Sequence, residues 1–275
     1  MMPAEFNEIS PAKINLFLKI ISKRDDGYHN LRSGVTLINL HDEVSAQKSS
    51  AFKVKYTGEF APPDNSFKDC IVEKIFSKFK IVKPQYSFTI KKNIPVKSGL
   101  GSASSNAAAV LRILKKLDYK EVKTINFSAI GADVPLFVEN QDSLIRGIGD
   151  ITIKQSFPKY YFLLIKPIQN CSTEEMYNEV DVKDINFDLN FDTDEISEFD
   201  MGNDFEIIAD RKYPEIATLL KFMRGFSEVI FSRLTGSGSC IYSAFDKKDS
   251  AEKALEIFKA RFPDHWAVVV ENNFL

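Results

Sequence analysis

The segment 95–105, PVKSGLGSASS, holds two glycines and four serines directly before an alanine- and leucine-rich stretch. Glycine lets the backbone approach an anion without a Cβ in the way, and a helix that begins at the end of the loop points free N–H groups at that anion. The serine hydroxyls would add hydrogen-bond donors. The loop therefore indicates phosphate binding, and the alternative is a plain turn before a helix. The candidate residues are Pro95, Val96, Lys97, Ser98, Gly99, Leu100, Gly101, Ser102, Ala103, Ser104 and Ser105.

Two widespread phosphate-binding motifs do not account for this loop. The P-loop requires Gly-Lys-Ser/Thr at its end, and the chain contains no such tripeptide. The dinucleotide-binding fingerprint requires a third glycine, but Ser104 stands at that position. It also requires an acid that ends the next strand, whereas Asp118 and Glu121 follow a predicted helix. We therefore set both motifs aside.

Three charged or amide side chains in two short motifs could act on a phosphate or a hydroxyl. Asp133 lies in GADVPLF, where Pro135 disfavours a continuing helix and apolar neighbours could desolvate the acid for use as a base. Lys13 and Asn15, in SPAKINLFLKI, occupy alternate positions and therefore share one face of a predicted strand. The alternatives are a helix-cap or turn role for Asp133 and a solvated strand face for Lys13 and Asn15.

Two turns carry further candidate residues. In DDGYHNL, Gly27 turns the chain and should expose Tyr28 and His29, which could stack on a base and hydrogen-bond its edge. The alternative is a pair of ordinary surface residues. The second turn, TGSGSC at residues 235–240, is rich in glycine and could be no more than a hairpin.

Strands and helices are both expected around these motifs, without the regular alternation of a doubly wound sheet. Hydrophobic spacing predicts an α+β fold, with strands at 8–21, 35–40, 52–56, 86–90, 143–145, 151–153, 160–165 and 266–270. It predicts helices at 71–79, 106–117, 204–209, 215–223 and 250–262, and a strand on each side of TGSGSC. The acidic segment 181–200 is expected to be a surface excursion and a domain seam.

The bulk composition excludes several classes of function. The 275 residues carry a formal net charge of −2, so the chain lacks the basic excess that binding to a nucleic-acid backbone requires. Its three cysteines are widely spaced and form no CxxC pair, which argues against a zinc ribbon or a disulfide framework. We expect no signal peptide, because the first residues show no basic and apolar signal pattern, and the sequence contains no apolar run of 18 residues. We therefore expect a cytoplasmic protein with no membrane partner.

Together the motifs resemble those of the GHMP kinase superfamily, in the same order along most of the chain. The resemblance rests on PAKINLFLKI followed by DGYHNL, on the loop ending GLGSASSNAAAVL, and on GADVPLF, with the Asn-Asp-Phe-Glu run at 203–206 as a further match. It implies a two-domain α+β fold with a ribosomal protein S5 domain 2-like N-terminal domain (1–155) and a ferredoxin-like C-terminal domain (156–275). It also implies ATP and Mg²⁺ as cofactors.

The resemblance is strongest to the branch that phosphorylates the 2-hydroxyl of 4-diphosphocytidyl-2-C-methyl-D-erythritol in the non-mevalonate isoprenoid route. It implies that residues 95–105 wrap the triphosphate of ATP. It implies that Asp133 takes the hydroxyl proton, while Lys13 compensates charge and Asn15 holds the methylerythritol end. Tyr28 and His29 would contact the cytosine, with Tyr177 on the other face of the base.

The sequence departs from the family pattern at Ser102 and Ala103, where the loop commonly carries glycine. We expect these two side chains to affect ATP affinity, because a side chain restricts how closely the backbone can approach a phosphate.

The alternative functions are another GHMP kinase, of the homoserine or mevalonate type, and a non-catalytic relative. The DGYHNL motif argues against the first, and the presence of both Asp133 and Lys13 argues against the second. We expect a monomer or a weak homodimer with a small-molecule substrate as its partner.

Overall fold

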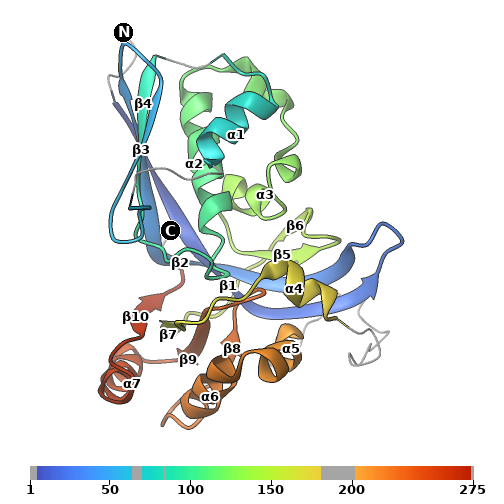
Figure 1. Cartoon of the computed structure of the whole chain (residues 1–275), viewed down its shortest axis with the longest axis vertical. Coiled ribbons are helices and arrows are strands. Elements are labelled where there is room, and N and C mark those ends of the chain that lie inside the picture. Colours follow the sequence, from blue (N-terminus) through green and yellow to red (C-terminus); the bar gives the residue numbers. More distant parts are fainter. Residues whose placement is uncertain (1–4, 64–69, 83–84, 181–201, 274–275) are drawn as a thin grey trace. The chain divides into compact units, whose positions relative to one another are not determined.

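The computed structural model describes residues 5–63, 70–82, 85–180 and 202–273 (Figure 1). The acidic segment 181–200 lies outside these residues. The chain forms two compact units that interleave along the sequence. Unit 1 comprises Met1–Ala12, Leu40–Val96 and Gly101–Gln141, and unit 2 comprises Lys13–Asn39, Lys97–Leu100 and Asp142–Leu275. The expected division at residue 155 stays a prediction, because these units group residues by contact.

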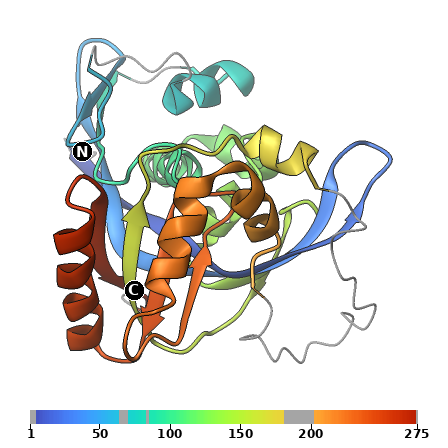
Figure 2. The ribbon, with the colours of Figure 1, turned by 60° about the horizontal axis from the view of Figure 1, so that its bottom comes forward.

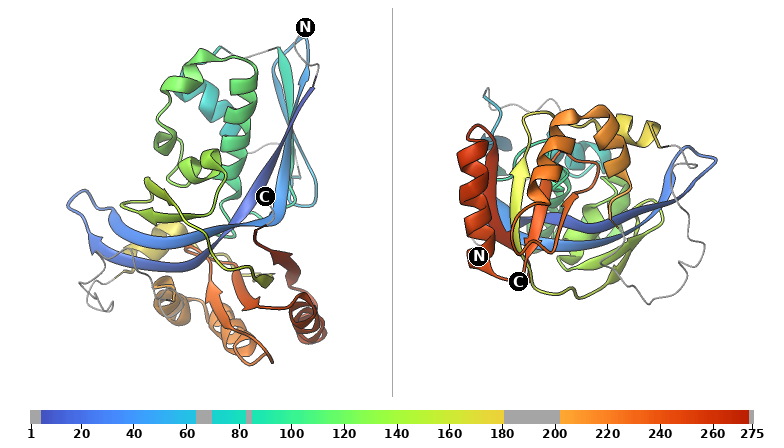
Figure 3. Two further views of the ribbon diagram at one scale, coloured as in Figure 1. Left: turned by 180° about the vertical axis from the view of Figure 1, so that it is seen from behind. Right: turned by 90° about the horizontal axis from the view of Figure 1, so that it is seen from below.

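Two long paired strands, β1 (Glu5–Lys23) and β2 (His29–Lys48), contribute to both units. They run side by side along their length (Figure 3). The strands expected at 8–21 and 35–40 are therefore confirmed, although both extend further than predicted. In β1 the residues from Ser10 to Leu18 are all buried, so this stretch lies in the interior rather than on a half-solvated sheet face.

Unit 1 packs helices against one face of its strands (Figure 1). The end of β2 pairs antiparallel with β4 (Tyr86–Lys91), and β4 pairs in parallel with β3 (Lys53–Thr57). The helices are α1 (Ile71–Lys78), α2 (Ser102–Lys116) and α3 (Val134–Glu139), with short 3₁₀ turns η1 (Lys120–Thr124) and η2 (Phe127–Ala129). α2 buries the continuous run from Ser105 to Leu111, which makes it the central helix of this core.

Two helix starts differ from the sequence expectation. α2 begins at Ser102 rather than at residue 106, so the last four residues of the predicted loop are helical. α3 begins directly after Asp133 with Pro135 in its first turn, whereas the proline was expected to interrupt a helix. That expectation was wrong because a first-turn residue has no intrahelical partner for its N–H, so proline fits there.

Unit 2 contains the start of β2 with β5 (Ser143–Arg146) and β6 (Ile151–Lys154), all antiparallel. It also contains an antiparallel sheet in the order β10-β7-β9-β8, formed by β7 (Tyr161–Lys166), β8 (Phe231–Leu234), β9 (Ile241–Phe245) and β10 (Trp266–Glu271). α6 (Pro214–Met223) and α7 (Lys248–Arg261) cover one face of this sheet (Figure 2). α4 (Thr173–Asn178) and α5 (Phe205–Lys212) complete the unit.

The mixed helices and largely antiparallel strands confirm the predicted α+β class. Each helix and strand predicted within the described residues has a counterpart, and α3, α4 and the 3₁₀ turns are additional. The three cysteines are all free, as their spacing predicts. Within the described ranges, no helix is long and apolar enough to cross a membrane.

Candidate functional site

Lys13 and Asn15 form a buried polar pair on β1 within unit 2. Each side chain is only 5% exposed, and the Lys13 ammonium donates a hydrogen bond to Oδ1 of Asn15. Nδ2 of Asn15 donates to Oγ of Ser33 at 2.8 Å. The alternate spacing thus places the two residues on one face, as predicted, but that face is buried rather than solvated. A lysine kept among polar partners away from water is suited to stabilising a phosphate charge.

The glycine-rich turn at 235–239 connects β8 and β9 and lies against this pair. Oγ1 of Thr235 accepts the backbone N–H of Asn15 at 3.1 Å. Gly236 has a φ of +56°, and a Cβ at this residue would lie 3.2 Å from Nζ of Lys13. The turn is therefore a hairpin connection, one of the two readings of the sequence. It also lies beside the Lys13 ammonium.

The middle of the predicted phosphate loop packs against the same turn. Gly99 has a φ of +75°, and a Cβ there would collide with the carbonyl oxygens of Thr235 and Gly238. The backbone N–H of Cys240 donates to the carbonyl of Ser98 at 3.0 Å, and that of Lys13 donates to the carbonyl of Leu100 at 3.1 Å. The glycine at position 99 is thus required by the neighbouring backbone, a reason that differs from the approach of an anion.

The end of the loop forms the N-terminus of α2. Gly101, with a φ of +74°, is the N-cap residue, and no side chain caps the helix. The uncapped first turn retains the positive end of the helix dipole, which favours an anion such as phosphate. Ala103 is exposed and Ser104 is half-buried, while Oγ of Ser105 accepts a hydrogen bond from Ser10 at 2.9 Å.

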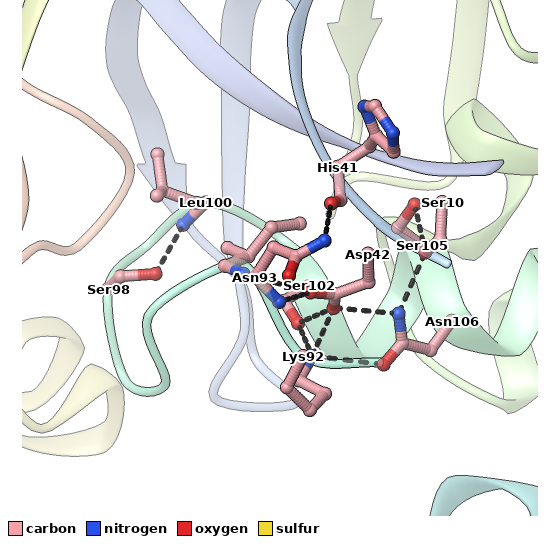
Figure 4. Close-up of polar contacts among 11 residues, drawn as sticks. Ser10, His41, Asp42, Lys92, Asn93, Ser98, Leu100, Ser102, Ser105 and Asn106 are labelled. Atoms are coloured by element: carbon pink, nitrogen blue, oxygen red, sulfur yellow. Dashed lines mark hydrogen bonds and ion pairs between the residues drawn. The ribbon is translucent and has the colours of Figure 1, made fainter. Parts of the chain in front are cut away.

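A buried ion pair between Asp42 and Lys92 joins the two ends of the loop within unit 1 (Figure 4). Oδ1 of Asp42 accepts the backbone N–H groups of Asn93 and Ile94 at 2.7 and 2.8 Å, directly before Pro95. Oδ2 of Asp42 accepts a hydrogen bond from Oγ of Ser102 at 2.9 Å, and the Lys92 ammonium also donates a hydrogen bond to this hydroxyl.

Nδ2 of Asn106 completes the network by donating to Oδ2 of Asp42 at 2.9 Å. Burial lowers the pKa of the Lys92 ammonium, and the Asp42 carboxylate opposes that effect. Sequence reasoning missed Asp42, Lys92 and Asn106. The available signal was the charged residue Asp42, close to the end of the predicted strand 35–40. The serine at position 102, noted above as a departure from the family pattern, uses its hydroxyl in this network.

Asp133 lies in unit 1 at the N-cap position of α3. It is half-buried, and its side chain makes no capping hydrogen bond to the helix. The position therefore agrees with the cap alternative, but the carboxylate does not perform the capping. Gly131 stands two residues earlier, where a Cβ would meet Oγ of Ser104 on α2 at 3.4 Å. Asp133 thus follows a segment that lies close to the first turn of α2.

His29 and Tyr177 form a stacked pair in unit 2. Their ring centroids are 5.5 Å apart with an interplanar angle of 29°. His29 is 5% exposed, so the expectation that the turn exposes it was wrong, whereas Tyr28 is 61% exposed as expected. Nε2 of His29 is buried and has no hydrogen-bond partner among the described residues. Burial and then the charge of Lys23 lower the pKa of His29 below its ordinary value, which favours the neutral ring.

The chain matches two sequence profiles, described as GHMP kinases N terminal domain (residues 65–152) and GHMP kinases C terminal (residues 189–264). It is 36% identical to a 4-diphosphocytidyl-2-C-methyl-D-erythritol kinase of Francisella philomiragia, with 86% of each chain covered. It is also 36% identical to the kinase of that name from Francisella tularensis subsp. tularensis, with 96% of this chain and 95% of the relative covered.

The chain belongs to the 4-diphosphocytidyl-2-C-methyl-D-erythritol kinase family. Membership makes it an ATP-dependent small-molecule kinase of the GHMP class, as the motifs predicted. A crystal structure of 4-(cytidine 5'-diphospho)-2C-methyl-D-erythritol kinase shares its fold, with a TM-score of 0.78 and 24% identity over 98% of this chain and 100% of the other. A mevalonate kinase of L. major shares the fold at a TM-score of 0.70 and 14% identity, over 99% of each chain.

Substitution of Asp42 tests whether the Asp42–Lys92 pair stabilises the fold and the two ends of the loop. Asp42→Asn would leave the buried Lys92 ammonium without its counter-charge, which costs about 3–5 kcal/mol of stability for a buried pair. The same change loosens both ends of the loop, so we expect the KM for ATP to rise by about 10-fold, the effect of about 1.4 kcal/mol. Binding of the acceptor substrate, measured by calorimetry without ATP, should be unchanged.

The neighbouring ion pair provides a matched control. Glu43 and Lys91 are adjacent in sequence to Asp42 and Lys92, but their side chains are 50% and 51% exposed. Glu43→Gln should therefore change stability by less than about 1 kcal/mol and leave the KM for ATP unaltered. An Asp42→Asn protein that unfolds at the wild-type urea concentration and has the wild-type KM for ATP would contradict the assignment.

Proposed function

We propose that this kinase transfers the γ-phosphoryl group of ATP to the 2-hydroxyl of 4-diphosphocytidyl-2-C-methyl-D-erythritol. The observation that carries the proposal is the 36% identity to kinases named for this substrate over nearly the whole chain. In the proposed mechanism, residues 95–105 wrap the triphosphate. Its negative charge would meet the uncapped first turn of α2, in keeping with the preference of helix N-termini for phosphate.

Two residues are proposed to act at the transferred phosphoryl group. Lys13 compensates the charge that develops there, and its burial beside Asn15 strengthens this effect because little water screens it. Asp133 accepts the proton of the 2-hydroxyl as the oxygen attacks phosphorus, and ADP leaves with the electron pair of the broken P–O bond. Most of the rate enhancement in such reactions comes from positioning and charge compensation, which a rigid set of buried partners supplies.

The cytosine is proposed to bind at the DGYHNL turn. Nε2 of His29 supports this assignment, because a buried ring nitrogen without a protein partner can pair with the edge of a base. Tyr28, with its exposed ring, and Tyr177 are proposed to stack on the base, and Asn15 to hold the methylerythritol end. Since His29 already stacks on Tyr177, the base would not lie between those two rings.

Substitution of His29 separates edge recognition from stacking. His29→Phe keeps a ring against Tyr177 but removes both nitrogens, so the preference in kcat/KM for the cytidine substrate over its uridine analogue should fall by about 10-fold. Tyr28→Ala should instead raise the KM for both analogues by about 5- to 150-fold, because stacking does not distinguish the bases. An unchanged base preference in a folded His29→Phe protein would remove His29 from the proposed site.

Mg²⁺ is part of the proposal because phosphoryl transfer requires charge neutralisation on the β- and γ-phosphates. Mg²⁺ is commonly held by phosphates, water and one or two carboxylates rather than by a protein cage. Over the described part of the chain, no cluster of three or more His, Cys, Asp or Glu side chains could hold a metal. This fits an ion that arrives with the nucleotide, and we assign it no protein ligand.

The function is tested by ATP turnover with a panel of acceptors at equal concentrations. We expect kcat/KM to be highest for 4-diphosphocytidyl-2-C-methyl-D-erythritol, and far lower for methylerythritol phosphate, homoserine and mevalonate. Equal turnover of bare methylerythritol phosphate would contradict a cytidine-dependent enzyme.

We also propose that the protein is cytoplasmic and is a monomer or a weak homodimer. The three free cysteines support the cytoplasmic location, because disulfides are rare in that compartment.

A further inference from the structure

The Asn-Asp-Phe-Glu run at 203–206 connects α5 to two other segments of unit 2. Asn203 is 5% exposed, and its Nδ2 donates to the carbonyls of Leu234 and Gly236, each at 2.8 Å. Its Oδ1 accepts the backbone N–H of Phe205 at 3.0 Å. Both donors and the acceptor of this amide are therefore engaged: one bond reaches the last residue of β8, and another reaches the glycine-rich turn at Gly236.

The neighbouring acids hold other parts of the same region. Asp204 accepts the backbone N–H of Ile20 on β1 at 2.8 Å and forms an ion pair with Lys19. Oε1 of Glu206 accepts the backbone N–H of Leu234 at 2.8 Å. Because β8 is an edge strand, the outward N–H and C=O of its last residue need partners other than a strand, and Glu206 and Asn203 supply them.

The turn that Asn203 holds lies directly against the Lys13 ammonium. A Cβ at Gly236 would be 3.2 Å from Nζ of Lys13 and 3.4 Å from Oδ1 of Asn15. Thr235 contacts the backbone N–H of Asn15 at 3.1 Å. A shift of the Gly236 carbonyl away from Asn203 would therefore open space beside Lys13 and loosen the packing that keeps its ammonium against Asn15.

We propose that Asn203 is a positioning residue for phosphoryl transfer. One side-chain amide bridges the carbonyls of Leu234 and Gly236, fixes the start of the turn, and through the turn keeps Nζ of Lys13 in place. Asn203 itself touches no substrate. This inference rests on the proposed role of Lys13, and it assigns a function to a motif that the proposed mechanism does not use. A misplacement of about 1 Å at a reacting group can reduce the rate about 100-fold.

Asn203→Asp tests the proposal because it preserves the shape of the side chain and removes both N–H donors. We expect kcat to fall by about 10- to 100-fold while the KM for ATP and for the acceptor changes less than about 3-fold. A fall in kcat with little change in either KM distinguishes positioning from general damage to the fold. General damage would lower the amount of active enzyme and leave the kcat of the folded fraction unchanged.

Asp204→Asn is the matched control. It changes a similarly buried neighbour that contacts β1 at Lys19 and Ile20, beyond Lys13 along the strand, and makes no bond to the turn. We expect this variant to lower the melting temperature but to keep kcat within about 3-fold of wild type, since Lys13 is not displaced. Hydrogen exchange without substrates supplies a second readout: the amides of 235–239 should exchange about 10-fold faster in Asn203→Asp and at the wild-type rate in Asp204→Asn.

A folded Asn203→Asp protein with wild-type kcat and wild-type exchange at 235–239 would overturn the proposal. If that variant does not fold, Asn203→Ala is measured in the same way, and failure of both to fold would show a folding role instead. Absence of wild-type turnover on the cytidine substrate would overturn the proposed function alone. The exchange measurement would then still decide whether Asn203 holds the turn.

Discussion

Replacement of Asp133 by asparagine should lower kcat by about 10²–10⁴, the range for removal of a general base. The carboxylate does not cap α3, and Asn is a good N-cap residue, so the variant should fold normally. The KM for ATP should barely change, because the loss is confined to the proton transfer. Initial rates over a range of ATP and acceptor concentrations, with circular dichroism as the check on folding, give both constants.

Glu139 provides the control for this substitution because it is an exposed acid at the other end of the same helix. Glu139→Gln should have wild-type kcat. If Asp133→Asn turns over near the wild-type rate while folded, Asp133 is not the base, and its place at the start of α3 is only structural.

Replacement of Lys13 by methionine should lower kcat by about 10²–10³, the effect of removing one donor aimed at developing charge. Methionine fills a similar volume, and Oδ1 of Asn15 can keep its hydrogen bond from Oγ1 of Thr235 at 3.3 Å, so the surrounding residues should stay in place. The KM for the acceptor should rise much less than kcat falls, because the charge matters most in the transition state. Steady-state kinetics with both substrates provides the comparison.

Lys55→Met is the control for Lys13, because Lys55 is also a strand lysine but is exposed on β3. It should leave both constants unchanged. A Lys13→Met enzyme in which only the KM for the acceptor changes would show that Lys13 binds substrate without stabilising the transition state.

Patterns local in sequence predicted much of the site. The alternation along β1 predicted that Lys13 and Asn15 share a face, and the glycines before an alanine-rich stretch predicted a loop that leads into α2. The short helix α4 was missed although Ser172 accepts the N–H of Glu175, a capping signal present in the sequence STEE.

Features that depend on distant partners could not be predicted in this way. His29 is buried because it stacks on Tyr177, which lies far away in sequence. Gly99 is a glycine because carbonyls of the 235–239 turn approach it. Asp42 acquires its role only when β2, the segment after β4 and the start of α2 come together. No local spacing encodes these contacts.

The position of the transferred phosphoryl group tests the central claim most directly. Purified protein is incubated with Mg²⁺, ATP and 4-diphosphocytidyl-2-C-methyl-D-erythritol, and the product is examined by ³¹P and ¹³C NMR. The account predicts a new phosphomonoester on the 2-hydroxyl, formed in the same amount as ADP, with the cytidine diphosphate intact. Formation of ADP without a phosphorylated acceptor, or a phosphomonoester on a different oxygen, would contradict it.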